Sequence, residues 1–209
     1  MRLRNVKGAS NIINSNPYII NDVESYKGRF KSLFNNDNNI HLEIGMGKGN
    51  FIIGMAKMYP NINFIGIEKY DSVIVRALEK LEDVDLPNLR LIRMDATNIE
   101  DIFLNEIDTL YLNFSDPWPK NRHENRRLTS AKFLERYEKI FKDEKKIIMK
   151  TDNRKLFEYS IKSFTDYWYK IEDISIDLYK DDLKYNVQTE YEKKFSSIGM
   201  PIYKICVKK

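Results

Sequence analysis

Apolar and polar positions follow two different rhythms along the chain from residue 40 onward. Short apolar runs of strand length are followed by segments with apolar residues at helical spacing. The predicted strands are 40–44, 61–67, 89–94, 107–114, 146–149, 171–178 and 202–207, and the predicted helices are 50–58, 72–81, 98–104, 129–141 and 153–164. This alternation predicts an α/β fold with a mainly parallel seven-stranded sheet, an antiparallel C-terminal edge and helices on both faces.

The first 39 residues do not share this pattern. They are polar, rich in asparagine and basic, which predicts a flexible N-terminal arm (residues 1–39) with a short helix at about 22–34. The run Asn35 to Asn39 has the composition of a loop and marks a boundary. Residues 40–209 contain no Gly/Ser linker and no internal repeat, so we expect them to form a single domain.

Composition narrows the class of protein. Apolar residues make up 42% of the 209 residues, enough for a substantial core. No apolar run reaches the roughly 18 residues that span a bilayer, and the basic N-terminus lacks the apolar segment of a signal peptide. Cys206 is the only cysteine and the two histidines are far apart, so neither an intrachain disulfide nor a metal site is expected. We therefore expect a cytoplasmic enzyme with no membrane partner.

Charge is distributed unevenly along the chain. Residues 36–116 contain seven Lys/Arg and fourteen Asp/Glu, a net charge of −7, whereas residues 1–35 and 117–209 carry +4 and +7. An acidic segment between basic flanks indicates two different ligands. A polyanion would bind the flanks, and a cationic or hydroxyl-rich ligand would bind the acidic part.

A glycine-rich turn follows the first predicted strand. The sequence Glu43 to Gly49, EIGMGKG, joins that strand to a helix, and its glycines allow the backbone to approach a ligand closely. The pattern is not the G-x-G-x-x-G fingerprint of dinucleotide-binding proteins, because Asn50 occupies the place of the third glycine. The turn therefore indicates a cofactor other than a dinucleotide.

Acidic residues end three successive predicted strands. Glu43 lies on the first, Glu68 follows the second, 23 residues after Gly45, and Asp95 follows the third. Glu68 is placed to accept hydrogen bonds from ribose hydroxyls, and Asp95 is placed near an adenine edge. Three carboxylates would repel a pyrophosphate but attract a sulfonium and an ammonium group. The sequence therefore favours S-adenosylmethionine over NAD.

The stretch 107–127 combines a buried strand, a rigid acidic turn and a cluster of cations. Asp116 lies just past the strand's carboxyl end, where ligands of open α/β sheets bind. Pro117 and Pro119 restrict the backbone around it. The cations that follow are suited to phosphate, and they are Lys120, Arg122, Arg126 and Arg127.

Six blocks follow one another along the chain, namely LEIGMGKG, GIEKY, MDA, NFSDPWPKNRHENRRL, KTDN and TEYE. In this order they resemble the bacterial tRNA (guanine-N7)-methyltransferase family. The resemblance implies a Rossmann-like class I S-adenosylmethionine-dependent methyltransferase fold. It also implies methyl transfer to N7 of a variable-loop guanine in tRNA, by a monomer or a homodimer.

The resemblance also implies roles for individual residues. The cofactor would be bound by Glu43, Gly45, Gly47, Glu68, Asp95 and Asp116, with Asp116 as the catalytic residue. Substrate contacts would come from Lys120, Asp152, Thr189, Glu190, Tyr191 and Glu192. RNA contacts would come from Arg122, His123, Glu124, Asn125, Arg126 and Arg127. In the family the basic segment often reads R-H-x-K-R-R, and here Asn125 replaces the lysine, which predicts one weaker phosphate contact.

Two assignments stay open at this level. Asp116, Asp152 and Glu192 are all candidates for the carboxylate that accepts hydrogen bonds from the guanine edge. Trp118 would either stack on an RNA base or pack under the loop as an anchor. Lys150 and Arg154 flank Asp152 and are candidates for further phosphate contacts.

Three other functions fit the sequence less well. An adenine N6-methyltransferase would carry an N/D-P-P-aromatic motif, but here Trp118 separates the two prolines. An NAD-dependent oxidoreductase would need the missing third glycine and a base at the hydride site. A non-catalytic RNA-binding module would leave the three strand-end acids without a task.

Overall fold

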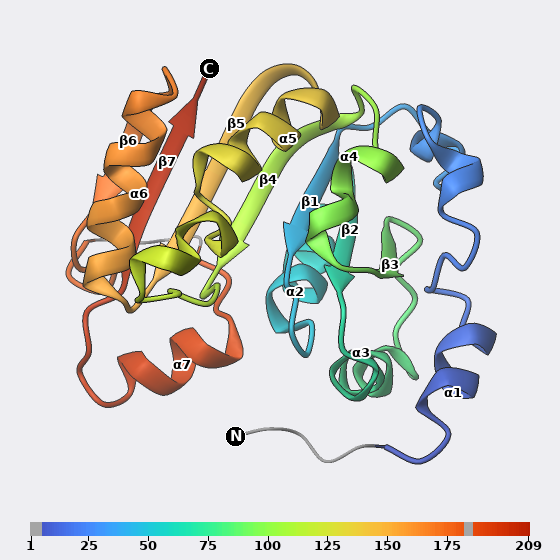
Figure 1. The fold of residues 1–209 in the computed structure, drawn as a ribbon. Coiled ribbons are helices and arrows are strands. Elements are labelled where there is room, and N and C mark those ends of the chain that lie inside the picture. Colours follow the sequence, from blue (N-terminus) through green and yellow to red (C-terminus); the bar gives the residue numbers. More distant parts are fainter. Residues whose placement is uncertain (1–5, 182–185) are drawn as a thin grey trace.

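Seven strands form one mixed sheet (Figure 1). The computed structural model describes residues 6–181 and 186–209. The strands are β1 (Ile40–Ile44), β2 (Asn63–Glu68), β3 (Leu89–Arg93), β4 (Ile107–Asn113), β5 (Phe141–Thr151), β6 (Lys170–Ser175) and β7 (Tyr203–Lys208), in the spatial order β3-β2-β1-β4-β5-β7-β6. Strands β1 to β5 are parallel, and β7 runs antiparallel to both β5 and β6. The structure thus confirms the predicted parallel sheet with an antiparallel C-terminal edge.

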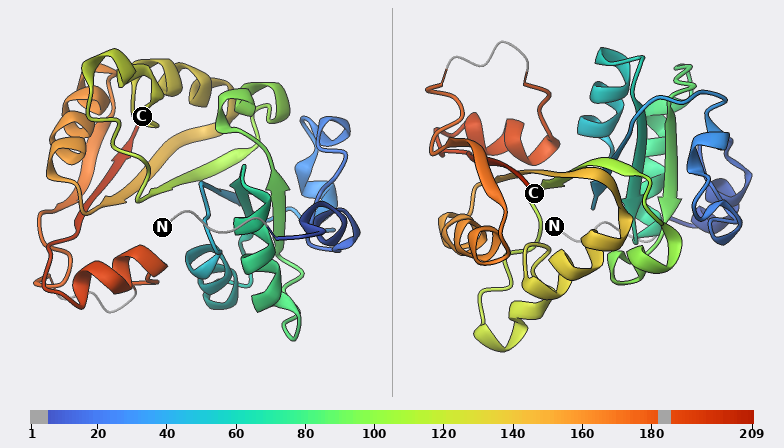
Figure 2. Two further views of the ribbon diagram at one scale, coloured as in Figure 1. Left: turned by 60° about the horizontal axis from the view of Figure 1, so that its bottom comes forward. Right: turned by 90° about the horizontal axis from the view of Figure 1, so that it is seen from above.

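Helices cover both faces of the sheet, as predicted. One face packs against α1 (Ala9–Ser15), α2 (Asn50–Met58) and α3 (Asp71–Leu78), and the other against α4 (Ile99–Ile102), α5 (Ala131–Ile140) and α6 (Arg154–Asp166). Viewed along the sheet, α5 and α6 lie on one side, and α2 lies on the other together with α7 (Glu190–Ser196) (Figure 2, right). Because both faces are covered, inner-strand residues such as Leu42 and Leu110 are fully buried.

Two elements differ from the sequence prediction. Strand β5 begins at Phe141, directly after α5, and is therefore longer than the predicted strand 146–149. Its first half contains a charged run (KDEKK) with the composition of a loop. Residues 142–144 of this run are exposed, and the pairing with β4 is irregular there, because Ile107 lies opposite Phe141 and Thr109 opposite Lys146. Helix α7 was not predicted at all. Short 3-10 turns occupy Glu24–Tyr26, Phe30–Leu33, Glu79–Leu81, Ala96–Asn98 and Asn121–Arg126.

The sequence predicted a flexible arm over 1–39. Residues 6–39 lie against the domain, and residues 1–5 lie outside the described residues. Residues 9–15 form α1, which contacts α3, and the expected helix at 22–34 is replaced by two 3-10 turns. Ile13 and Phe30 are fully buried, and the Phe30 ring lies 4.6 Å from that of Phe103. Glu106 fixes the segment by accepting hydrogen bonds from the backbone N–H groups of Gly28 (2.9 Å) and Phe30 (2.6 Å). A few well-spaced apolar side chains thus dock a segment whose average composition is polar.

The two edge strands of the sheet, β3 and β6, differ in whether another segment pairs with their outer side. Along β3, the N-terminal segment continues the hydrogen-bond ladder: Leu91 N donates to Tyr18 O (2.8 Å), and Ile20 N donates to Leu91 O (3.0 Å). Strand β6 forms the other edge, and no described segment pairs with its outer side. Its apolar side chains Ile171 and Ile174 are exposed.

Within residues 6–181 and 186–209, no helix is both long and apolar enough to cross a membrane. The same residues contain no group of three or more His, Cys, Asp and Glu side chains arranged to hold a metal ion.

Candidate active site

Five carboxylates lie at the carboxyl ends of the five parallel strands, which point downward in Figure 1. Following the sheet from its β3 edge, they are Asp95, Glu68, Glu43, Asp116 and Asp152. Residues far apart in sequence are brought to one edge because the strands are parallel and adjacent. The sequence-predicted acids are therefore arranged as a row, with the glycine turn beside its centre.

The glycine turn is held close to this row. Gly45, Gly47 and Gly49 all have positive φ angles (72°, 59° and 79°), which other residues adopt only with strain. At Gly49 a Cβ atom would also approach the Ala77 side chain of α3 to 3.0 Å. Gly47 N donates to Glu68 Oε2 at 3.3 Å, so the turn is tied to the end of β2. The backbone at this turn is thus open to a ligand.

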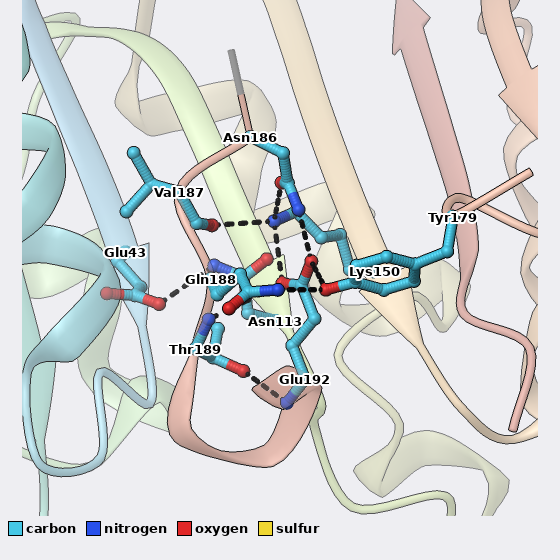
Figure 3. Close-up of polar contacts among 9 residues, drawn as sticks. All are labelled: Glu43, Asn113, Lys150, Tyr179, Asn186, Val187, Gln188, Thr189 and Glu192. Carbon is cyan, nitrogen blue, oxygen red and sulfur yellow. Dashed lines mark hydrogen bonds and ion pairs between the residues drawn. The ribbon is translucent and has the colours of Figure 1, made fainter. Parts of the chain in front are cut away.

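Glu43 is a buried carboxyl with an unused oxygen. Its Oε1 accepts a hydrogen bond from Asn113 Nδ2 of β4 at 2.8 Å (Figure 3). Its Oε2 has no hydrogen-bond partner among the described residues, and neither do Asn113 Oδ1 and the nearby Ser115 Oγ. A buried polar atom without a partner is costly, so such atoms commonly mark a ligand site. Glu43 and Asn113 therefore fit a ligand that carries cationic or donor groups.

Burial also changes the protonation of Glu43. Desolvation raises the pKa of the Glu43 carboxyl to about 8, against the opposing effects of the Asn113 hydrogen bond and the Lys150 charge. A neighbouring cation would restore the charged form. Binding of a positively charged ligand would therefore favour loss of the proton from the Glu43 carboxyl.

Glu68 and Asp95 are oriented by backbone donors. Glu68 Oε1 accepts from the N–H groups of Lys69 (2.8 Å) and Tyr70 (3.2 Å), while burial raises the pKa of its carboxyl. Asp95 Oδ1 accepts from Thr97 N at 2.9 Å, a bond that lowers the pKa of Asp95. Fixed carboxylates of this kind can accept further hydrogen bonds from a sugar or a base.

Asp116 sits on a strained turn. Phe114 and Trp118, two residues to either side, have φ angles of 50° and 42°, which is unfavourable for bulky residues. Phe114 N donates to Lys150 O at 2.8 Å, so the turn starts from a fixed point on the sheet. The Asp116 side chain itself is exposed at the strand end. Strain held beside an exposed acid is typical of functional turns.

The basic turn after Asp116 is organised around Trp118. The indole is half-buried, Arg126 lies over its ring at 4.8 Å, and His123 contacts it edge-on at 5.6 Å. These contacts are those expected of Trp118 as a loop anchor. Arg127 Nη2 donates to Trp118 O at 3.2 Å, and its guanidinium lies 4.2 Å from the Tyr159 ring centre, so Arg127 holds the turn. The remaining polar side chains of the turn are exposed, namely Lys120, Asn121, Arg122, Glu124, Asn125 and Arg126.

The four residues of the TEYE segment, each predicted to contact the substrate, differ in exposure and in the contacts they make. Thr189 Oγ1 accepts from Glu192 N at 2.9 Å, and Glu192 Oε2 accepts from Thr189 N at 3.4 Å, which together form a capping box at the start of α7. Both side chains are buried, Glu192 completely. Glu190 pairs with Lys80, in the 3-10 turn Glu79–Leu81 that follows α3, at 2.6 Å. Only Tyr191, which is 58% exposed and roughly parallel to the Phe114 ring at 6.3 Å, is displayed.

Lys150 is the main residue of this site that the sequence misassigned. The expected phosphate contact is instead a buried ammonium that lies 2.9 Å from Glu192 Oε2 (Figure 3). Asn113 and Lys80 were missed entirely. The pattern T-x-x-E is itself a helix-start signal, and it would have identified both α7 and the internal role of Glu192. No comparable sequence signal marks Asn113 or Lys80.

The family model and the relatives of similar sequence both identify methyltransferases. A family model described as "Putative methyltransferase" matches residues 37–205. The chain is 52% identical to a tRNA (guanine-N(7)-)-methyltransferase of Bacillus velezensis, over 98% of the chain and 95% of that protein. It is 53% identical to the protein of the same name from Geobacillus sp. (strain WCH70), over 100% and 96%. It is 48% identical to that from Streptococcus gordonii, over 98% of both.

Solved structures share the fold at low sequence identity. An antibiotic-related methyltransferase superposes with a TM-score of 0.64 at 16% identity, covering 87% of this chain and 92% of its own. A SAM-dependent methyltransferase from Aquifex aeolicus gives 0.56 at 13% identity, covering 97% of both chains. The fold of residues 6–181 and 186–209 is therefore one that methyltransferases use.

Proposed function

The chain belongs to the family of tRNA (guanine-N(7)-)-methyltransferases, and from this premise we propose that it transfers a methyl group from S-adenosylmethionine to N7 of a guanine in the variable loop of tRNA. One observation carries the assignment to this site. The strained Asp116 turn begins beside the Glu43–Asn113 pair and leads directly into an exposed basic turn. A cofactor site and a polyanion-binding surface thus meet at one strand end.

The residues at the sheet edge fit S-adenosylmethionine. The unpartnered Glu43 Oε2 and Asn113 Oδ1 match a ligand with a cationic, hydrogen-bonding end. Glu68 is suited to ribose hydroxyls, Asp95 to the adenine edge, and the open backbone at Gly45 and Gly47 to close approach. When bound, the cofactor supplies a methyl group activated by a positively charged sulfur.

The protein's part in the reaction is positioning and electrostatics. Guanine N7 has an in-plane lone pair and carries no proton, so no general base is required. Holding N7 in line with the methyl group supplies several kcal/mol of the barrier. The purine becomes positively charged as the bond forms, and the Asp116 carboxylate stabilises that charge. Asp116 therefore acts without removing a proton.

The burial of Glu192 makes it a poor candidate for the carboxylate that accepts hydrogen bonds from the guanine edge. Its oxygens are taken up by Lys150, Tyr179, Asn186 and the α7 capping box. Asp116 and Asp152 remain as carboxylates that can accept from the guanine N1–H and amino group. On the RNA side, the exposed Lys120, Arg122 and Arg126 bind phosphate, with Tyr191 nearby as a stacking surface.

Incubation with radiolabelled S-adenosylmethionine and unmodified tRNA, followed by nucleoside analysis, tests this function. We expect label in 7-methylguanosine, and label in an adenine nucleoside, or none, would contradict the proposal. The Asp116→Ala variant should lower kcat by at least about 100-fold while tRNA binding is retained, because its charge acts in the transition state. Wild-type turnover in this variant would remove Asp116 from the catalytic role.

A further inference from the structure

Residues Asn186–Glu192, called the docking segment below, lie at the carboxyl end of the sheet (Figures 1 and 3). The segment contacts Lys80 on one side and Lys150 of β5 on the other. Val187 packs against Gly54 of α2 so closely that a Cβ at Gly54 would lie 2.6 Å from Val187 Cγ1. Glycine inside a helix is destabilising relative to alanine, and the contact with Val187 explains why glycine is nevertheless found at position 54. The docking segment is thus seated directly on the helix that follows the glycine turn.

Lys150 fixes one side of the docking segment. Its ammonium donates to Asn186 Oδ1 (2.7 Å), Val187 O (3.0 Å) and Glu192 Oε2 (2.9 Å), which uses all three of its N–H groups. Glu192 also accepts from Tyr179 Oη at 3.0 Å and from Asn186 Nδ2 (Figure 3). A buried charge pair keeps its place only with such complete pairing. The docking segment therefore has a defined position relative to β5 and Asp152.

Lys80 fixes the other side and reaches the cofactor turn. Its ammonium donates to Lys48 O of the glycine turn at 2.7 Å, to Asn50 Oδ1 at the start of α2, and to Glu190 Oε1 of α7 at 2.6 Å. One donor thus holds the glycine turn, the second holds the start of the helix that follows it, and the third holds α7, which carries Tyr191. Movement of either element breaks a hydrogen bond to the other.

We propose that Lys80 is a positioning residue that couples the two ligands of the enzyme: by fixing the docking segment to the glycine turn, it makes bound cofactor increase the affinity for tRNA. The inference rests on the proposed function, since it assigns cofactor to the turn and tRNA to the side displaying Tyr191. By linkage, bound tRNA increases the affinity for cofactor by the same factor.

The test is a binding cycle that measures the tRNA dissociation constant with and without saturating S-adenosylhomocysteine, the cofactor product, which cannot react. We expect the wild type to bind tRNA at least about fivefold more tightly with the ligand, the lower end of typical couplings. In Lys80→Met the ratio should fall to about one. Lys80→Arg, which keeps the charge and the donors, should restore part of it.

Two further variants separate coupling from charge and stability. Lys57→Met removes an exposed lysine of α2 and so matches the charge change, and it should keep the wild-type ratio. Gly54→Ala leaves Lys80 intact but displaces Val187, so it should lose coupling, and its melting temperature distinguishes that loss from a loss of folding. A wild type without coupling, or a Lys80→Met variant that behaves like Lys57→Met, overturns the inference. The proposed function fails separately, through nucleoside analysis of the wild-type product.

Discussion

Glu43 is a single residue whose protonation should control cofactor binding. Its carboxyl has a pKa of about 8 because of burial, so below that pH it is mostly neutral and attracts a cation weakly. We expect the affinity for S-adenosylhomocysteine, which carries an ammonium group, to rise from pH 6 to pH 8, by up to about tenfold per pH unit. Calorimetry across this range measures the effect. In Glu43→Gln the dependence should be flat, and an equally steep dependence in that variant would exclude Glu43 as its origin.

The same group has the opposite effect on the stability of the free protein. The folded state keeps a proton on Glu43 between its ordinary pKa of 4.5 and about 8, whereas the unfolded state loses it. The stabilising contribution of that proton is therefore complete below pH 4.5 and is lost as the pH rises through 8. A higher pH therefore increases the affinity for the ligand and decreases the stability of the free protein, through the same carboxyl group.

At the scale of elements, the basic turn Asn121–Arg126 and its neighbours divide into two sets of cations. Arg122 and Arg126 are exposed, whereas Arg127 is bonded to Trp118 O and packed on Tyr159. Changing Arg122 and Arg126 together to Ala should weaken tRNA binding and reduce the slope of log K against log salt by roughly 1.4–1.8, two phosphate contacts. Titration at several salt concentrations measures this.

Arg127→Ala is the contrasting variant for that turn. It should lower the melting temperature, because the turn loses its anchor to Trp118 O. Lys132→Ala, an exposed lysine on α5, controls for the loss of a charge away from the site. If the double variant changes the salt slope no more than Lys132→Ala does, Arg122 and Arg126 do not contact phosphate.

The sequence predicted the elements whose signal is local. Inner strands such as β1 and β4 are buried at nearly every position because both faces of the sheet are covered, and the acids at their ends follow from parallel topology. Helix α7 was missed because seven residues give little periodicity, although the sequence contains the T-x-x-E pattern of its capping box. The Lys150–Glu192 pair joins residues 42 apart in sequence, and only the tertiary fold brings them together. Asn113 was missed for the same reason, since its partner Glu43 lies on another strand.

At the scale of the whole molecule, the N-terminal segment is expected to contribute to stability. Helix α1 offers a matched pair: Ile13 is fully buried, and its neighbour Ile12 is 43% exposed. Ile13→Ala should lower the free energy of unfolding by about 2–5 kcal/mol, since it removes buried methyl groups and leaves a cavity. Ile12→Ala should change it by less than about 0.5 kcal/mol. Denaturant unfolding measures both, and equal, small effects would restore the picture of a free arm.

The unequal edges of the sheet have a consequence for how the chain behaves in a crowded cell. A strand with free N–H and C=O groups is a template for another chain, and the outer side of β3 is protected because Tyr18 to Ile20 occupy it. The protection of that side depends on residues 18–20 remaining in place. On β6 the exposed Ile171 and Ile174 stand beside Lys170, Glu172 and Asp173, charges that discourage strand addition. One edge of the sheet is thus protected because another segment occupies it, and the other because strand addition would have to desolvate charged side chains.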